Sequence, residues 1–442
     1  MKIRMSPTRL IAFGFLMVIL VGALLLMLPV SSKGEPVSFL DALFTATSAT
    51  CVTGLVVLDT FTSWTGFGQV VILLLIQIGG LGLMTVITLF SFALGKRLGL
   101  YNRIVLMQSA GNMTLSGIGS LIRRIIPFTF VIEALGAALL AIRFIPEFGF
   151  GKGLWFSAFH SVSAFCNAGF DLMGGRAPFS SMTHYVADPL VTLTLSALII
   201  IGGLGFLVWR DIRNQGFHFS KYQLHTKLVL VSSAALLFGG WLLFLIFEWN
   251  AAMEGLTVPQ KLLAAFFQSV TPRTAGFNTL DLNKLSESGN LLTNVLMLIG
   301  GSPGSTAGGM KTTTVAVLLL CTWTSARGRR RDHAFCYSLD RDMLRQAASI
   351  VMIYLTMAIV AILLLCAMEP ITIKQAMFEV NSAIGTVGCT LGITPQLGVA
   401  SQILVILLMY VGRLGGLTFT LIFARQRPEP PIDRPTGKLL IG

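Results

Sequence analysis

The sequence has few charged residues, few histidines and few cysteines for a chain of its length. Only 12% of its 442 residues are charged, whereas 54% are hydrophobic, and there are five histidines. Soluble domains carry about 25% charged residues, so this composition excludes an ordinary soluble protein. No nucleophile stands beside a base in a catalytic pattern, which argues against an enzyme. A membrane protein with several spans is the class that remains.

The six cysteines show no C-x-x-C pair or other metal-binding spacing. Four of them lie within or beside apolar segments, where a free thiol packs as a small hydrophobic side chain. The net charge of +13 comes from short basic clusters between apolar segments. Because these clusters do not form one basic face, nucleic-acid binding is not expected.

The apolar runs are long enough for about eight membrane spans, since roughly 20 helical residues cross the hydrocarbon core. The first run follows Lys2, Arg4 and Arg9 and is longer than the apolar region of a cleaved signal peptide, so we expect it to be retained. The predicted spans are residues 10–30, 69–94, 118–144, 187–209, 226–248, 291–323, 346–368 and 401–424.

The spans form four pairs, and each pair encloses a half-length apolar segment followed by a short glycine-containing stretch. The stretches read VTGL, NAGF, TAGF and TVGC, with their glycines at positions 54, 169, 276 and 388. These glycines are 115, 107 and 112 residues apart, which indicates an internal repeat of a quarter of the chain. We predict repeats over residues 1–100, 101–215, 216–335 and 336–442.

Each half-length segment of about a dozen residues is too short to cross roughly 30 Å of hydrocarbon as a helix. It must enter the membrane and return. Non-helical backbone at this depth is tolerated where it is buried in protein or lines a watery cavity, so four such loops should converge on one axis. The expected fold is an all-α integral membrane protein, with four tandem helix–pore loop–helix repeats and eight transmembrane helices around a pseudo-fourfold pore.

Basic residues predict the orientation, because they favour the cytoplasmic side. Connecting segments on the side of the N-terminus hold 22 Lys and Arg residues, whereas the side from which the loops enter holds 8. We therefore expect a multi-pass protein of the plasma membrane with both termini in the cytoplasm. Lys311 and Arg413 fall inside predicted spans and need another explanation.

The four glycine stretches are the candidate ion site. A monovalent cation crossing a membrane exchanges its hydration shell for oxygens, which rings of backbone carbonyls supply without fixed charge. Glycine permits the backbone conformations that this requires, and the uncharged stretches argue against a carboxylate site for divalent ions. The candidate filter residues are Val52, Thr53, Gly54, Leu55, Asn167, Ala168, Gly169, Phe170, Thr274, Ala275, Gly276, Phe277, Thr386, Val387, Gly388 and Cys389.

Acidic residues follow three of these glycines. Asp59, Asp171 and Asp281 stand 5, 2 and 5 residues after them. They either raise the local cation concentration at a pore mouth or are ordinary solvated loop acids. The sequence favours neither interpretation.

The sixth span contains the longest glycine-rich stretch. Glycine clusters also occur at 79–82, 202–205 and 412–416, where they can serve close helix packing. The cluster at 300–309 differs because it extends through ten residues and includes Pro303, which interrupts a helix. A 33-residue span broken in its middle fits the membrane, and the break is expected beneath the four loops.

We expect this stretch to act as a gate; the alternative is a static kink. It nearly matches the phosphate-binding pattern G-x-x-x-x-G-K-[ST], but Met310 separates the glycine from the lysine and no strand precedes it. The match is therefore coincidental. The candidate gate residues are Gly300, Gly301, Ser302, Pro303, Gly304, Ser305, Thr306, Ala307, Gly308, Gly309, Lys311 and Arg413.

Arg413 is costly inside an apolar span unless it faces protein or water. It lies 12 residues into a span of 24, which argues against a side chain that reaches for the membrane surface. We expect it to bond carbonyls of the 300–309 stretch and to form an electrostatic barrier to cations. Lys311 either joins it as a second partner or reaches the cytoplasmic interface.

Three further polar residues lie in apolar surroundings. His160 is expected to be packed and not metal-bound, because no second ligand has helical spacing to it. Glu133 and Glu379 either pair with a cation or support packing.

The repeats, and the motifs SATCVTGL, FCNAGFDL, VTPRTAGFNTLD, GTVGCTLG and GRLGGLTF, resemble the potassium transporters of the Trk/Ktr/HKT superfamily. An extra helix pair ahead of the first repeat, as in the longer Trk subunits, is not evident, so we expect the KtrB and KtrD membrane subunits to be the nearer relatives. The resemblance implies potassium uptake, with Gly54 accompanying potassium preference where serine accompanies sodium transport.

The same resemblance implies a homodimer and a cytoplasmic ring of nucleotide-binding regulatory subunits. Potassium at the filter is then the transported ion and the only metal ion expected. No cofactor is expected in this chain, and the sequence leaves open whether sodium is an activator or a coupled ion.

The competing class is an alternating-access cation symporter with sodium as the main or coupled ion. Such a carrier predicts broken helices in corresponding positions of two halves. Here one of eight spans is overtly broken and the period is a quarter of the chain, which favours a pore. A membrane enzyme is a distant third.

Overall fold

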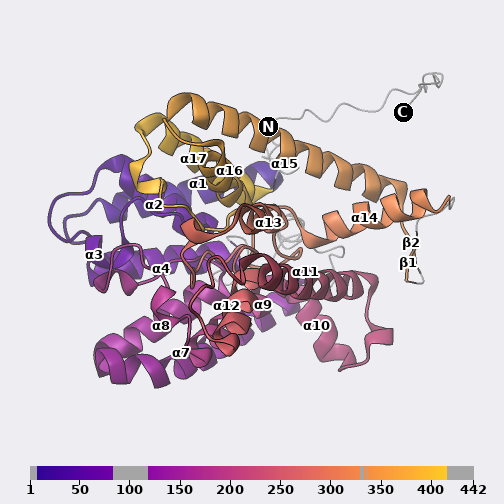
Figure 1. Ribbon diagram of the computed structural model, residues 1–442, viewed down its shortest axis with the longest axis horizontal. Coiled ribbons are helices and arrows are strands. Elements are labelled where there is room, and N and C mark those ends of the chain that lie inside the picture. The colour runs from indigo at the N-terminus through magenta and orange to yellow at the C-terminus, as the bar shows by residue number, and fades with distance from the viewer. Residues whose placement is uncertain (1–6, 83–117, 329–332, 336, 416–442) are drawn as a thin grey trace, which may run out of the picture.

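The computed structural model describes residues 7–82, 118–328, 333–335 and 337–415, and these residues are almost entirely helical (Figure 1). The strands of this part are β1 (His333–Ala334) and β2 (Tyr337–Ser338), which form one short antiparallel pair. The expected all-α fold class is confirmed.

The first two predicted repeats contain the helices of the indigo-to-magenta half of Figure 1. The first has α1 (Pro7–Leu26), α2 (Phe39–Cys51), α3 (Thr60–Ser63) and α4 (Gly66–Leu81). The second has α7 (Ile118–Phe148), α8 (Phe150–Phe165), η1 (Met173–Gly175), η2 (Thr183–Tyr185), α9 (Pro189–Leu204) and α10 (Phe206–Gln215). Each repeat therefore presents a long helix, a half-length helix and a second long segment.

The remaining helices repeat this order. The third predicted repeat has η3 (Phe219–Lys221), α11 (Leu224–Glu248), α12 (Val258–Val270), η4 (Leu282–Lys284), α13 (Glu287–Leu298) and α14 (Thr312–Ala326). The fourth has α15 (Arg341–Met368), α16 (Ile373–Gly385), η5 (Thr394–Gln396) and α17 (Val399–Leu414). The residue numbers at which one repeat passes into the next remain predictions.

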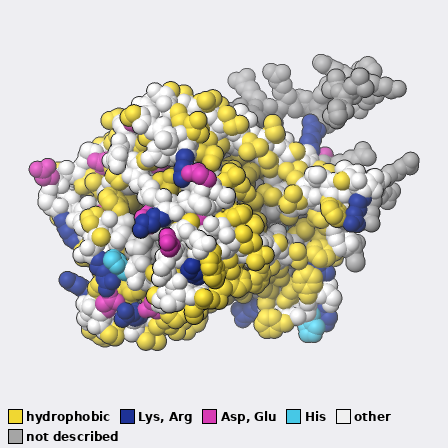
Figure 2. Space-filling model, in the orientation of Figure 1, with side chains coloured by type: hydrophobic (Ala, Val, Ile, Leu, Met, Phe, Trp, Pro, Cys, Tyr) yellow, Lys and Arg dark blue, Asp and Glu magenta, His cyan; other side chains and the backbone are white. Residues whose placement is uncertain are grey.

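The first helix of every repeat is long and apolar enough to cross a membrane. Within the described residues, α1, α7, α11 and α15 meet this test over 19 to 27 residues. Their outward faces carry large apolar side chains; Leu135, Leu242 and Leu363 are 58%, 58% and 65% exposed. Figure 2 shows such hydrophobic side chains over much of the visible face, as expected for a surface that contacts lipid.

The second span of the second repeat is not one continuous helix, so the expectation that a single span is broken is wrong. Helices α9 and α10 meet at a bend of 90°. Gly205 lies between them with φ of +93°, and the Phe206 amide donates to the carbonyl of Gly304 at 2.9 Å. This left-handed backbone is readily available to glycine and ends the helix. The predicted spans 69–94 and 401–424 continue beyond the described residues.

The half-length helices α2, α8, α12 and α16 have 13 to 16 residues and form the expected re-entrant segments. Neighbouring repeats contact one another in cyclic order, through α4 with α8, α9 with α12, α13 with α16, and α17 with α2. The last contact joins the fourth repeat to the first. The four repeats therefore close into a ring, as the pseudo-fourfold prediction requires.

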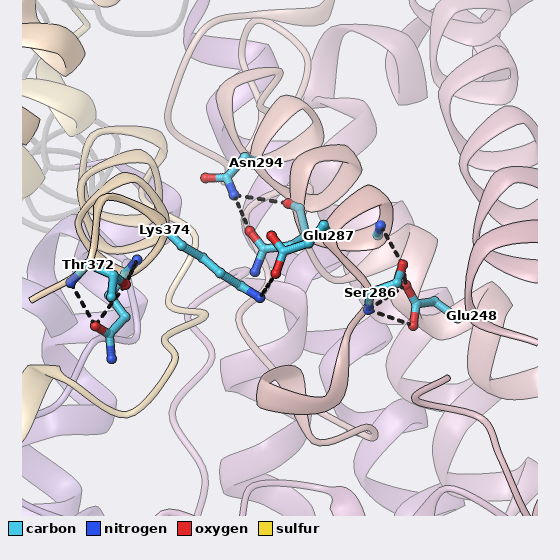
Figure 3. A network of polar contacts seen from close by, with 9 residues as sticks. Glu248, Ser286, Glu287, Asn294, Thr372 and Lys374 are labelled. Carbon is cyan, nitrogen blue, oxygen red and sulfur yellow. Dashed lines mark hydrogen bonds and ion pairs between the residues drawn. The ribbon is translucent and has the colours of Figure 1, made fainter. Parts of the chain in front are cut away.

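Polar contacts connect helix ends within the third repeat and between the third and fourth repeats (Figure 3). The Glu248 carboxylate, at the end of α11, accepts from the Ser286 hydroxyl at 2.6 Å and from the Ser286 amide at 3.1 Å, at the start of α13. A carboxylate is favoured at a helix N-terminus. Lys374 of α16 reaches Glu287 of α13 at 2.8 Å, which joins the two repeats near the ends of their helices.

Candidate functional site: a ring of four loops above a broken helix

The four predicted filter stretches lie against one another in the interior of the protein. All 16 candidate residues lie at or directly after the C-terminal ends of the half-length helices, and all are buried. Such helix ends present unpaired carbonyl groups and the negative end of the helix dipole. This environment suits a cation.

The four loops share one backbone conformation. The glycines have φ values of +94°, +71°, +79° and +97°. The residue two positions earlier is also left-handed in every loop: Val52, Asn167, Thr274 and Thr386 have φ values of 58°, 60°, 68° and 52°. In a β-strand, successive carbonyls point to opposite sides. Left-handed residues at every second position change this pattern, so that successive carbonyls of a loop can point to the same side. The four loops therefore share an approximately fourfold-symmetric backbone although their sequences differ.

No side chain fits at the glycines, because each one faces the next loop. A Cβ atom on Gly169 would stand 2.7 Å from the Ala275 carbonyl oxygen, well inside van der Waals contact. The same relation, from a glycine to the carbonyl before the next glycine, holds around the ring: Gly54 to Ala168, Gly169 to Ala275, Gly276 to Val387 and Gly388 to Thr53. Because the last pair returns to the first loop, the ring is closed by backbone.

Hydroxyl groups from the half-length helices brace this ring. The Gly54 and Gly388 amides donate to the hydroxyls of Ser48 and Ser382, at 3.0 and 3.1 Å. The Ser163 and Thr271 hydroxyls donate to the carbonyls of Phe170 and Phe277, at 2.7 and 2.5 Å. None of these four residues was among the predicted site residues, although three of the four hydroxyls stand six residues before the glycine.

The predicted break in the sixth span is confirmed. Helix α13 ends at Leu298 and α14 begins at Thr312. The intervening residues, which we call the cross-loop (299–311), fold back on themselves: the Gly300 amide donates to Met310 at 2.8 Å and the Thr312 amide to Gly301 at 3.1 Å. The eleven candidate residues from Gly300 to Lys311 therefore belong to one compact loop.

The cross-loop is fastened to the second repeat. The Ser302 amide donates to the Gly203 carbonyl at 3.0 Å, and the Thr306 hydroxyl to Phe165, the last residue of α8, at 3.2 Å. It also lies directly against the fourth filter stretch, since a Cβ atom on Gly308 would collide with the Thr386 hydroxyl. The loop thus lies next to the ring, between its second and fourth members.

Arg413 reaches the cross-loop as predicted. From α17 it donates one hydrogen bond to the carbonyl of Thr306 and another to the carbonyl of Gly79 at the end of α4. The alternative of a side chain extended to the membrane surface is wrong. Lys311 is the second partner, because its Nζ donates to the carbonyls of Ala307 and Gly308 at 2.8 and 3.3 Å.

The other glycine clusters allow close packing, as expected. A Cβ atom on Gly79, Gly202 or Gly412 would collide with a carbonyl oxygen near the end of the half-length helix in the same repeat. They also end helices: Gly82, Gly205 and Gly415 follow the last helical residues with φ values of +83°, +93° and +86°. Packing and helix termination therefore coincide in three of the four clusters.

His160 and Glu379 occupy equivalent positions, nine residues before the glycines of loops two and four. His160 accepts from the Leu172 amide at 3.1 Å, and Glu379 accepts from the hydroxyls of Thr390 and Thr394 at 2.7 and 2.6 Å. Both side chains hold the segment that follows the ring. His160 is packed, as predicted.

The three acidic residues after the glycines differ in environment. Asp59 is 7% exposed, caps α3, and accepts from the Phe179 amide at 2.9 Å; it is neither solvated nor free to face a pore. Asp281 caps η4 and borders a cavity of about 500 Å³ beside loops three and four. Burial, together with a smaller effect of the neighbouring Asp59, raises the pKa of Asp171 to about 7.

A ring of four re-entrant loops beside a broken helix, inside a helical shell with apolar outer faces, indicates a membrane transport protein. The family model for TrkH, cation transport protein, matches residues 8–434. The chain therefore belongs to the TrkH family of cation transport proteins.

Relatives match the chain over its full length. It is 44% identical to the potassium/sodium uptake protein NtpJ of Enterococcus hirae, over 99% of this chain and 98% of that protein. It is 40% and 33% identical to the Ktr system potassium uptake proteins B and D of Bacillus subtilis, covering at least 99% of this chain and 98% of each relative. These relatives are transport proteins and not enzymes.

The fold also matches a solved structure. The crystal structure of the potassium transporter TrkH from Vibrio parahaemolyticus superposes with a TM-score of 0.75, at 18% identity, over 96% of this chain and 86% of that one. A match at this identity carries the fold alone, and it agrees with the four-repeat architecture.

Proposed function

We propose that this protein takes up potassium ions through the ring of four loops and that the cross-loop is the gate beneath it. The observation that carries the proposal is the closed ring, in which each glycine faces the carbonyl before the next one. Its walls are backbone oxygens, which select a monovalent cation without fixed charge. The relatives named for potassium uptake support the choice of ion.

Unpaired hydroxyls support an ion path at the ring. Thr50, Thr53 and Thr386 bury hydroxyl oxygens that have no protein partner among the described residues. Buried polar atoms almost always have partners, so atoms left without one beside a candidate filter suit contact with water or a passing ion. All three lie in or just before the predicted filter stretches.

The gate proposal rests on the position and charge of the cross-loop. It contacts the fourth stretch through Gly308 and holds two cationic side chains, Lys311 and Arg413, by their bonds to its carbonyls. A cation leaving the ring on this side meets positive charge and buried backbone. Glycines allow the loop to change conformation, and opening requires Arg413 to release Thr306.

A pore is preferred to an alternating-access symporter. Breaks in both the second and third repeats mean that the number of broken spans no longer separates the two classes. The closed fourfold ring still separates the two classes, because a carrier built from two related halves would place its ion site between those halves. Coupling to sodium, or activation by it, remains a proposal that the name of the Enterococcus relative motivates.

We further propose the assembly that the Ktr relatives suggest. The names of the Bacillus proteins describe parts of a Ktr system, which fits a membrane subunit acting with cytoplasmic nucleotide-binding subunits. A homodimer and cytoplasmic termini complete this proposal. Labelling of single-cysteine variants at Glu35 and Asp340, made in a background without the native cysteines, with a membrane-impermeant thiol reagent tests the orientation.

Isotope uptake into cells that lack their own potassium transport tests the proposed function. Cells carrying this chain, with its regulatory subunits, should accumulate labelled potassium in preference to sodium. Arg413→Ala should raise the unstimulated potassium flux, because the gate loses its charge and its tie to Thr306. Equal uptake of the two ions, or no uptake at all, would contradict the ion assignment.

A further inference from the structure

Glu133, in the middle of α7, is a buried carboxylate that the proposed filter and gate do not use. It is 4% exposed. Gln77 of α4 donates from Nε2 to both carboxylate oxygens, at 3.1 and 3.3 Å, and the Cys166 thiol lies 4.0 Å from Oε1. Among the described residues no lysine or arginine forms an ion pair with it. An acidic side chain inside a membrane protein usually marks a functional position.

Gln77, the hydrogen-bond partner of Glu133, lies next to Gly79, whose carbonyl accepts a hydrogen bond from Arg413. Gln77 precedes Gly79 by two residues, in the last turn of α4. Carbonyls in a last turn lack helical partners and form the negative end of the helix dipole. The Gly79 carbonyl therefore attracts the guanidinium that also holds Thr306.

The end of α4 is packed tightly around the same cluster. A Cβ atom on Gly80 would stand 2.6 Å from the Cys166 sulfur, and that sulfur lies 3.7 Å from Oε1 of Gln77. Helix α4 is thus held against α7 by the Gln77–Glu133 pair and against α8 by Cys166. A rotation or slide of α4 would move the Gly79 carbonyl away from Arg413.

We propose that Gln77 and Glu133 are positioning residues that stabilise the closed gate although neither belongs to the cross-loop. They hold the end of α4 so that Arg413 can reach Gly79 and Thr306 at the same time. The inference rests on the proposed gate function of the cross-loop. A chain of contacts then runs from α7 through α4 and Arg413 to the gate, across four repeats of the fold.

Resting potassium flux, normalised to the amount of protein in the membrane, tests this inference. Glu133→Ala and Gln77→Leu should each raise the unstimulated flux about tenfold, by the loss of one charge-assisted hydrogen bond at the gate. Glu133→Gln keeps an acceptor for the Gln77 amide and should behave as the wild type. Lys374→Met removes an inter-repeat contact far from the gate and should leave the flux unchanged.

A double-variant cycle separates anchoring from general stability. With Arg413→Ala already present, Glu133→Ala should add no further flux, because the side chain that it positions is gone. Flux that falls with Glu133→Ala, or rises equally in both backgrounds, would overturn the inference, as would a Glu133→Gln variant with the alanine phenotype. If Arg413→Ala leaves the resting flux unchanged, the gate proposal is wrong. If Arg413→Ala raises the flux but the Glu133 variants do not, only the proposed positioning role is wrong.

Discussion

Arg413 of α17 and Thr306 of the cross-loop are joined by a hydrogen bond between the guanidinium and a backbone carbonyl. The same guanidinium binds Gly79 at the end of α4, so one side chain of the fourth repeat ties the third repeat to the first. An arginine in this position is stabilised by carbonyl acceptors. Its charge and its two bonds together make it the latch of the proposed gate.

Lys311 should help Arg413 to keep the proposed gate closed. Lys311→Met removes its bonds to the Ala307 and Gly308 carbonyls and one positive charge beside the ring. Because a hydrogen bond from a charged donor contributes about 1.5–3 kcal/mol and Arg413 remains, we expect resting potassium flux to rise about fivefold. Isotope uptake normalised to protein amount measures this, with Lys284→Met as the control on an exposed lysine; unchanged flux would assign Lys311 to structure alone.

The hydroxyl braces should support ion selectivity. Ser382→Ala leaves the buried Gly388 amide without its hydrogen bond, at a cost of about 1–3 kcal/mol, and loosens the fourth loop. We expect the ratio of potassium to sodium uptake to fall several-fold while transport persists. Ser349→Ala, which removes a hydroxyl bonded within its own helix, is the control. A selectivity ratio equal to that of the wild type would show that the brace does not shape the filter.

Asp171 should give uptake a pH dependence. Burial, with a smaller effect of Asp59, raises its pKa to about 7, so the carboxyl group is mostly neutral below this pH and mostly negative above it. If it attracts cations to the pore mouth, uptake at low potassium should increase as the pH rises through 7, and Asp171→Asn should flatten the curve. A variant that keeps the slope would assign the pH dependence elsewhere. Asp340→Asn, at a distant helix cap, is the control.

Gly205 should be required for the bend between α9 and α10. Its φ is +93°, and a Cβ atom there would stand 2.8 Å from the Pro303 carbonyl oxygen. Gly205→Ala should therefore destabilise the protein by about 1–3 kcal/mol, visible as a lower thermal midpoint in detergent. Gly239→Ala in α11 meets no atom within 4 Å and should raise the midpoint slightly. Equal midpoints for the two variants would contradict the strain argument.

The repeats, the half-length helices and the break at 300–309 could be predicted because each leaves a mark on composition: a period, a length too short for the membrane, or a run of glycine and proline. The bend at Gly205 could not. The clusters at 79–82 and 202–205 are both GGLG, and the contact at the bend, from the Phe206 amide to the Gly304 carbonyl, joins residues that lie far apart in the sequence.

The hydroxyl braces were missed for a related reason. Hydroxyls on a helix commonly bond a carbonyl of their own helix, as Thr47 does with Leu43 and Ser157 with Gly153. Within the helix nothing distinguishes Ser48 from Thr47, and only the six-residue spacing to the glycine, which recurs in three loops, marks Ser48 in the sequence. Only the folded loop, which returns its glycine amide to the helix end, gives Ser48 a different partner.

The potassium-to-sodium uptake ratio of Gly54→Ser tests the central claim most directly. The added Cβ collides with the Ala168 carbonyl, so the ring must open at that point and its carbonyls lose their spacing. The account predicts loss of potassium preference, with sodium entering at a comparable rate, whereas Gly66→Ala, which meets no neighbouring atom, keeps the wild-type ratio. A Gly54→Ser protein that still prefers potassium as strongly as the wild type would contradict the filter assignment.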